Sequence, residues 1–236
     1  MFFEELLANP SFKAALWGII LIAVFILFSK LKKEKSESLK LFLFWSMTVV
    51  IVFVTLFIAG RTVHKNITSI SGGPIHWHAD FKIFNCGEEL DLVDPRGLVN
   101  RIGTSVLHEH GDNRIHVEGV LEKREDASLS SFFEVIGGEM KPNILKIPTN
   151  EGFVTMGNGN SCNGERGVLQ VFKYSTDGTT IKQEKLSNFT GYVLKAESII
   201  PPGDCLIIEF DRLKNKTNNI CKFYEIEINK GNLEYN

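Results

Sequence analysis

The sequence predicts an α+β protein in which an N-terminal hairpin of two transmembrane helices is followed by a mixed-sheet domain with one main helix. Three observations support this fold class. The first sixty residues hold an excess of apolar residues, gathered in two long runs. Beyond residue 74, short segments alternate polar with apolar residues and are separated by Gly, Pro, Asn and Asp, as strands and turns are. One stretch among them has apolar residues at helical spacing.

Residues 1–63 are expected to form the transmembrane hairpin, with spans at about 10–29 and 41–60. Asn9 is a favourable N-cap, and Pro10 suits the first helical position. Roughly 20 apolar residues cross a bilayer, a length that the first run reaches if the ammonium of Lys13 extends to the interface. The second run carries no charge. A secretory signal is the alternative for the first run, but its charged flank follows the apolar core and no small-residue cleavage site is present.

The connection at residues 30–40 contains five lysines, which places it in the cytoplasm by the positive-inside rule. Both ends of the hairpin then face outward. Residues 64–73 are expected to be a short tether, and residues 74–236 an extracytoplasmic domain of a multi-pass cell-membrane protein. The lipid bilayer is thus the first expected partner, with other envelope membrane proteins as further candidates. The net charge of −2 gives no indication of a nucleic-acid partner.

Four cysteines lie beyond residue 80, and an even count in an oxidising compartment favours disulfides. Among the three possible connectivities, we favour Cys86–Cys162 and Cys205–Cys221. The alternatives are four free thiols or thiolate metal ligands, which no CxxC pair supports.

The outer domain is expected to be rich in strands. The expected loop covers residues 94–105, and residues 158–164 are too rich in Asn and Gly for regular structure. One helix is predicted near residues 126–137, with Asp126 as N-cap and Gly137 in the left-handed position after it. It is the only convincing helix after the membrane segment. Turns are expected at 176–178 and 201–204, and strands at 75–84, 88–92, 114–121, 167–174, 192–195, 205–210 and 222–228.

Five of the six histidines fall within 41 residues, from His76 to His116, where even scatter would place about one. His76 and His78 form one HxH pair, and His108 and His110 form another. Alternate residues of a strand point to the same face, roughly 6.5–7 Å apart, so each pair is able to share a metal ion. His116 lies in a segment with strand-like alternation. The sequence therefore predicts a metal site built from these five histidines.

Neutral imidazole is a ligand for zinc, copper, iron and nickel. Asp80, Asp112 and Glu118 are the expected additional ligands, or the partners that orient the imidazole rings. In the simpler interpretation, the histidines are structural residues that hydrogen-bond within a polar surface.

The segments HWHADFKIFNCGEELDL, LHEHGDNRIHVEG, SCNGERGVLQVF and GDCLIIEFD resemble a family of uncharacterised, membrane-anchored extracytoplasmic proteins of archaea and bacteria. The resemblance covers roughly residues 74–229. The order strand–strand–helix–strand–strand also looks like a β-grasp, or ubiquitin-like, domain. Some members of the family are labelled protein disulfide isomerases. This implies a thiol–disulfide activity, although disulfide exchange normally uses an attacking and a nearby resolving thiol, as in CxxC.

The leading hypothesis is a membrane-anchored, extracytoplasmic protein that binds zinc or copper through its histidines. A metal-free interaction or assembly module of the cell envelope is the first alternative, and a thiol–disulfide oxidoreductase or isomerase is the second. A metal ion with an open coordination position would activate water. However, no general base lies at a motif-like spacing, so catalysis stays an open question and no catalytic residue is assigned.

Overall fold

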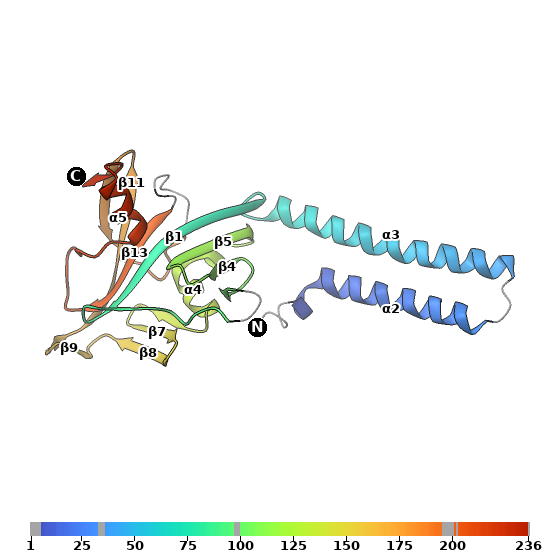
Figure 1. Cartoon of the computed structure of the whole chain (residues 1–236), viewed down its shortest axis with the longest axis horizontal. Coiled ribbons are helices and arrows are strands. Elements are labelled where there is room, and N and C mark those ends of the chain that lie inside the picture. The colour runs from blue at the N-terminus through green and yellow to red at the C-terminus, as the bar shows by residue number, and fades with distance from the viewer. Residues whose placement is uncertain (1–5, 33–35, 97–99, 195–200, 202, 236) are drawn as a thin grey trace. The chain divides into compact units, whose positions relative to one another are not determined.

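The computed structural model describes residues 6–32, 36–96, 100–194, 201 and 203–235. The chain divides into two compact units, Met1–Thr68 and Ser69–Asn236. The first unit contains the long helices α2 (Pro10–Leu31) and α3 (Glu37–Thr68), and the second contains a mixed sheet with short helices (Figure 1). The predicted α+β class, with two apolar helices before a sheet domain, is confirmed.

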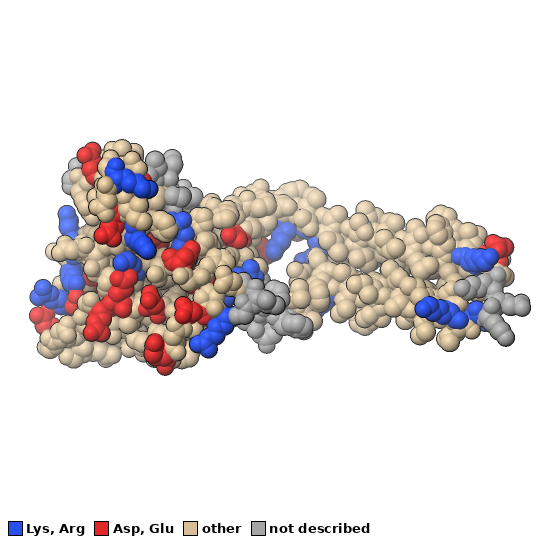
Figure 2. All heavy atoms as spheres, viewed as in Figure 1, with Lys and Arg blue, Asp and Glu red and all other residues tan. Residues whose placement is uncertain are grey.

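Helices α2 and α3 are both long and apolar enough to cross a membrane. The side chain of Asn9 accepts a hydrogen bond from the Ser11 backbone N–H, as expected of an N-cap, and Pro10 begins the helix. Charged side chains gather at the ends of the two helices and not along them (Figure 2). Helix α3 extends to Thr68, so the first part of the expected tether is helical.

Gly18 sets the contact between α2 and α3. A Cβ atom at this position would lie 2.9 Å from Cγ2 of Val54 and 3.8 Å from Cγ1 of Val50. The missing side chain therefore lets the two helices approach closely. Small residues commonly allow close packing between helices in lipid, where the hydrophobic effect contributes little to helix association.

The main sheet of the second unit has the strand order β14-β12-β11-β13-β1-β5-β4-β3, and β2 also pairs with β1. Strand β1 is central. It is parallel to β13 and antiparallel to β5, so the sheet is mixed. The strands are β1 (Pro74–Asn85), β2 (Glu88–Leu90), β3 (Ile102–Gly103), β4 (Leu107–Glu109), β5 (Arg114–Val120), β11 (Val168–Asp177), β12 (Thr180–Lys185), β13 (Asp204–Asp211) and β14 (Glu234–Tyr235).

One face of this sheet packs against the helix α4 (Leu129–Val135), which follows the 3₁₀ turn η1 (Arg124–Ala127). Phe132 and Phe133 of α4 are fully buried, and the Phe132 ring lies 5.6 Å from that of Phe81 on β1. The opposite face carries a second, smaller core around Phe172, Tyr174 and Ile207, covered by the helix α5 (Lys222–Asn229). Of the residues of β1, the second core includes Phe84, near the end of the strand.

Smaller strands complete the unit. β6 (Glu139–Lys141), β7 (Ile144–Thr149) and β8 (Gly152–Gly157) form a three-stranded antiparallel sheet, which the sequence analysis did not predict. β9 (Ser161–Cys162) pairs with β10 (Glu165–Arg166). Part of the stretch expected to be irregular, residues 158–164, is thus a short strand. Likewise, β3 interrupts the loop expected at 94–105, of which residues 97–99 lie outside the described part.

The predicted strand at 222–228 is wrong, because these residues form α5. The alternation of Tyr224, Ile226 and Ile228 suggested a strand. However, Tyr224 and Ile228 are also four residues apart, so one helical face brings both to the second core. Helix α4 is therefore not the only helix of the domain.

The expected N-cap Asp126 is also wrong. The hydroxyl of Ser128 accepts the hydrogen bond from the Ser131 N–H, while Asp126 accepts one from the Lys123 N–H within the preceding turn. Gly137 does adopt a positive φ of 87° after the helix, as predicted. Within the strand expected at 192–195, Val193 makes only an isolated bridge with Ser128, and Lys195 lies outside the described residues.

Candidate metal centre

The five clustered histidines come from three adjacent strands and the turn after the third. In the antiparallel pair of β1 with β5, His78 lies opposite His116, and His76 lies opposite Glu118. Residues opposite each other in a ladder share a face, so these four side chains emerge together. The intervening residues, such as Val117, face the apolar core. Alternation therefore separates the polar and apolar sides of the two strands.

Strand β4 adds the second HxH pair. His108 lies opposite His116 on the other side of β5, and His110 follows directly after the strand. A turn with positive φ at Gly111 and Asn113 then leads into β5. The buried Glu109 holds this turn, because its carboxylate accepts hydrogen bonds from the backbone N–H groups of Asp112 (2.6 Å) and Asn113 (3.1 Å).

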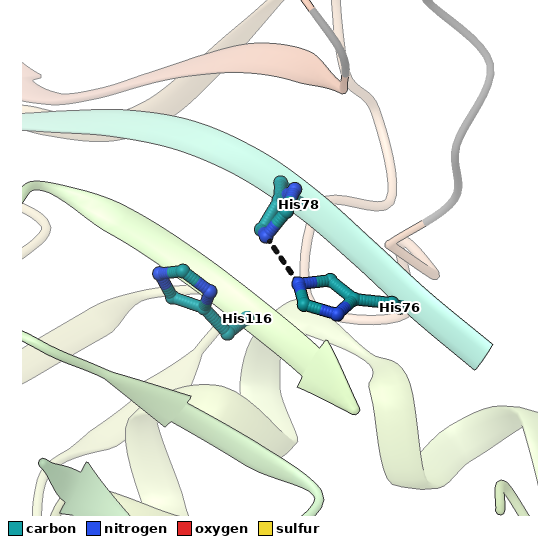
Figure 3. Close-up of side chains that lie close together, drawn as sticks. All are labelled: His76, His78 and His116. Carbon is teal, nitrogen blue, oxygen red and sulfur yellow. Dashed lines mark hydrogen bonds between the residues drawn. The ribbon is translucent and has the colours of Figure 1, made fainter. Parts of the chain in front are cut away.

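His116 is the common member of two sets of three histidines. His76, His78 and His116 form the first set, and His108, His110 and His116 form the second. Within each set, one nitrogen per ring lies within 4.8 Å of the others. Figure 3 shows the first set, in which Nε2 of His76 lies 2.9 Å from Nε2 of His78. The expected convergence of the two HxH pairs thus occurs around His116.

Glu118 reaches both sets. Its Oε1 lies 3.3 Å from Nε2 of His76 and 4.0 Å from Nδ1 of His116. Its Oε2 lies 3.9 Å from Nε2 of His108. A carboxylate at these distances could ligate an ion or orient the rings.

Two hydrogen bonds fix which ring nitrogens remain free. Nε2 of His116 lies 3.2 Å from Oδ2 of Asp112, and Nδ1 of His110 lies 2.6 Å from the Asn100 carbonyl oxygen. Because a carboxylate or carbonyl oxygen only accepts, both of these nitrogens donate. In the neutral rings this leaves a lone pair on Nδ1 of His116 and on Nε2 of His110, and a lone pair is what binds a metal ion.

Burial keeps the central rings neutral. It lowers the pKa of His78 to about 4, and the nearby His116 and Arg114 add to this effect. It also lowers the pKa of His108 to about 4 and that of His116 below its usual value. His108 is only 1 % exposed and His116 9 %. These rings are therefore neutral at neutral pH, so each of them has one ring nitrogen with a lone pair that a metal ion could use.

The buried rings also carry unsatisfied polar atoms. Among the residues that the structure describes, Nδ1 of His108 and Nδ1 of His116 have no hydrogen-bond partner. Leaving a buried polar group unpaired costs free energy, so such atoms are rare in folded proteins. A metal ion would supply the missing partner, which is a structural test that the donor set passes.

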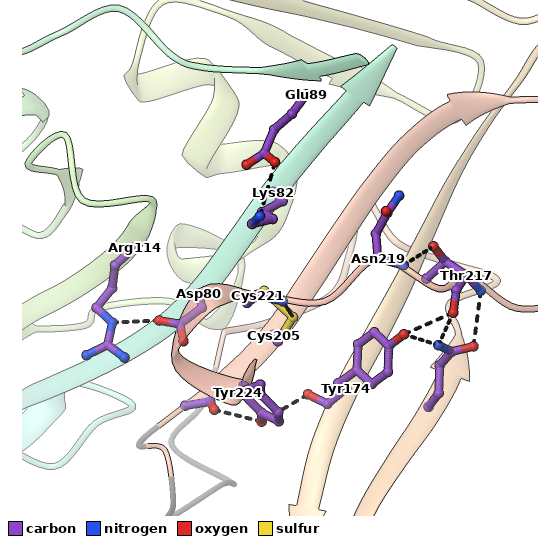
Figure 4. The surroundings of a disulfide bond; sticks show 12 residues. Asp80, Lys82, Glu89, Arg114, Tyr174, Cys205, Thr217, Asn219, Cys221 and Tyr224 are labelled. Atoms are coloured by element: carbon purple, nitrogen blue, oxygen red, sulfur yellow. Dashed lines mark hydrogen bonds and ion pairs between the residues drawn. A yellow bond between two sulfur atoms is a disulfide. The ribbon is translucent and has the colours of Figure 1, made fainter. Parts of the chain in front are cut away.

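Asp80, one of the expected additional ligands, is engaged elsewhere. Its Oδ1 accepts a hydrogen bond from Nε of Arg114 at 2.6 Å (Figure 4). Burial raises the pKa of this carboxyl despite that partner. The guanidinium of Arg114 also lies 4.2 Å from the ring centroid of Phe223 on α5. Asp80 thus links the sheet to α5 through Arg114. The link depends on the register of β1 with β5, which places Asp80 opposite Arg114.

The structure pairs Cys86 with Cys162 and Cys205 with Cys221, with their Cα atoms 5.4 and 5.7 Å apart. This is the connectivity that we favoured. The second pair connects β13 to the residue that precedes α5 (Figure 4). All four cysteines are used, so none is left to ligate a metal ion.

No protein-family model matches the chain, and no curated protein or solved structure is significantly similar to it. The chemistry of the centre is therefore inferred from its own side chains. Five imidazoles, three of them held neutral by burial, lie on neighbouring strands and the turn after β4, and one carboxylate, that of Glu118, lies within 4.0 Å of three of them. Imidazole with carboxylate is a donor set that proteins use for zinc and copper.

Proposed function

We propose that the protein is a membrane-anchored, extracytoplasmic metal-binding protein. Its second unit carries zinc or copper at the centre made by His76, His78, His108, His110 and His116. The observation that carries this proposal is the position of His116, whose buried ring lies within reach of two further pairs of imidazoles. Glu118 and Asp112 are the carboxylates that contact these rings, and they are the proposed additional ligands.

The arrangement favours metal binding over a purely structural role for the histidines. A structural histidine in a buried position normally has both ring nitrogens hydrogen-bonded or solvated. Here, rings from three strands turn toward one another, and two buried nitrogens, Nδ1 of His108 and Nδ1 of His116, are left unpaired among the described residues. A divalent cation would give such an unpaired nitrogen a partner.

The first unit provides the evidence for the proposed cellular location. Helices α2 and α3 have the length and composition of membrane spans, and Lys30, Lys32 and Lys40 flank their connection. The positive-inside rule then puts this connection in the cytoplasm and the second unit outside. Two cysteine pairs at bonding distance agree with an oxidising compartment. The lipid bilayer is the proposed partner of the helices.

We also propose that the main sheet is a β-grasp core. Strand β1 occupies the middle, with β5 on one side and the parallel strand β13 on the other. Beyond β13 come β11 and β12, and α4 follows β5 in the chain. This order supports the β-grasp arrangement expected from the sequence.

The proposal is tested by the metal content of the purified full-length protein in detergent. After stripping, incubation with zinc or copper and extensive dialysis, the parent protein should retain metal, and His78→Ala should retain less. His64→Ala is the matched control, because it removes the one histidine outside the cluster. Retention absent in the parent would favour the metal-free envelope module instead, and equal retention in all three proteins would show that the metal is bound outside this centre.

A further inference from the structure

We propose that the cluster is a two-ion centre in which the imidazole of His116 bridges the ions. One ion is held by His76, His78 and Nδ1 of His116, and the other by His108, His110 and Nε2 of His116. The inference rests on the proposed metal-binding function and adds a second binding site to it.

The histidine ligands divide into two sets. Two sets of three histidines, and not one set of five, meet the spacing of a shared ion in the described part of the chain. Zinc is usually four-coordinate, so one ion would leave one of five histidines without a role. With His116 counted in both sets, each ion has three imidazoles and a nearby carboxylate. Every histidine of the cluster then has a function.

The orientation of the His116 ring also fits a bridge between two ions. Its Nδ1 lies 4.0 Å from Oε1 of Glu118, which is itself 3.3 Å from Nε2 of His76, while Oε2 of the same carboxylate lies 3.9 Å from Nε2 of His108. Its Nε2 faces Asp112, which lies in the turn two residues after His110. Figure 3 shows one ring nitrogen of His116 directed toward His76 and His78 and the other directed away from them. One nitrogen thus faces the first set, which leaves the other for the second set, as a bridging imidazole requires.

The hydrogen bond to Asp112 predicts the order in which the sites fill. It places the ring proton on Nε2 and the lone pair on Nδ1, so the first ion binds beside His76 and His78 without removing a proton from His116. The second ion must displace the Nε2 proton. The N–H bond breaks, an N–metal bond forms, and the proton leaves through the half-exposed Asp112 to solvent, with no change in oxidation state.

The stoichiometry of zinc binding tests the number of sites. Metal-stripped full-length protein in detergent, titrated with Zn²⁺ alone, should bind two ions per chain. His76→Ala removes a ligand of the first set, and His110→Ala removes a ligand of the second. Each variant protein should therefore bind one ion. His64→Ala should still bind two. One ion in the parent would overturn the two-ion centre but leave the proposed function standing, whereas no ion in the parent would overturn both.

The bridge itself is tested by electron paramagnetic resonance of the protein loaded with Cu²⁺ alone. Two Cu²⁺ ions joined by one imidazole should couple magnetically, so the spectrum of the parent should lose the signal of isolated ions. His76→Ala, with one ion, should show an uncoupled signal. Two ions with uncoupled spectra in the parent would show that His116 does not bridge them. This result does not depend on whether a variant of the buried His116 folds.

Discussion

His78 on β1 and His116 on β5 lie directly opposite each other in the sheet, with their ring centroids 4.7 Å apart and the rings nearly perpendicular. Two residues that are 38 positions apart are thus neighbours only because β1 and β5 pair in this register. The same register places Glu118 beside His76 and Arg114 beside Asp80. The candidate centre is consequently a property of the sheet, and it should respond to whatever holds the sheet in place.

Acid should destabilise the metal-free protein. The pKa of His78 and of His108 is about 4 in the folded chain, against 6.5 for an unperturbed imidazole. Between these values the unfolded chain takes up protons that the folded chain does not, so stability present above pH 6.5 is lost as the pH falls toward 4. Thermal melts of the full-length protein across this range should show a falling Tm. A double variant, His78→Asn with His108→Asn, should show a smaller slope, and an unchanged slope would contradict the assignment.

Gly203, the residue directly before β13, lies against the backbone of His78 on β1. It has a φ of 96°, and a Cβ atom there would overlap the backbone carbonyl of His78. Gly203→Ala should therefore displace β1 and lower both the unfolding free energy and the amount of bound zinc. Gly178→Ala is the matched control, because its φ is also positive, at 61°, but nothing lies within 4 Å.

The control substitution should cost about 1–3 kcal/mol through backbone strain alone. Gly203→Ala should cost more, because strain and overlap add. Chemical denaturation of the full-length protein in detergent, with metal analysis of the folded fraction, compares the two. Equal losses in both variants would show that the contact between Gly203 and His78 does not position the strand.

Much of the fold was predictable because its signals are local. The membrane helices follow from the length of two apolar runs, and β1 and β5 follow from alternation over many residues. Helix α5 was mispredicted because Tyr224 and Ile228 fit both a strand and a helix, and only the second core decides between them. The sheet of β6–β8 was missed in a segment for which no element had been predicted.

The site was predictable to a lesser degree. HxH spacing identified the five histidines, since it depends only on neighbouring residues. Their division around His116 was not predictable, because it requires the pairing of β4 with β5 and of β5 with β1. Glu109 was missed although it lies between His108 and His110, because its role is to hold the turn and not to face the cluster. The turn residues Gly111 and Asn113 after it were the available indication.

The cysteine pairs should be oxidised in the protein isolated from cells. Alkylation without reductant should leave all four cysteines unmodified, and peptide mapping should find Cys86 joined to Cys162 and Cys205 to Cys221. Replacing Cys205 and Cys221 by serine should lower the unfolding free energy by about 3 kcal/mol, the chain-entropy value for a loop of about this length. Four alkylated thiols would contradict both the pairing and the oxidising compartment.

The second unit should be accessible from outside the cell. Protease added to intact cells or spheroplasts should remove residues 69–236 and leave a fragment that contains α2 and α3. A cytoplasmic protein in the same sample, which should stay intact, is the control for leakage. Digestion of the second unit only after the membrane is opened would reverse the proposed topology.

The most direct test of the central claim is X-ray absorption spectroscopy of the full-length protein after loading with zinc. The account predicts a first shell of nitrogen and oxygen at about 2.0–2.2 Å with the multiple scattering of imidazole, and no sulfur shell at about 2.3 Å. His78→Ala should reduce the imidazole contribution, and His64→Ala should leave it unchanged. A sulfur shell, or a zinc ion without imidazole scattering, would contradict a metal centre built on these histidines.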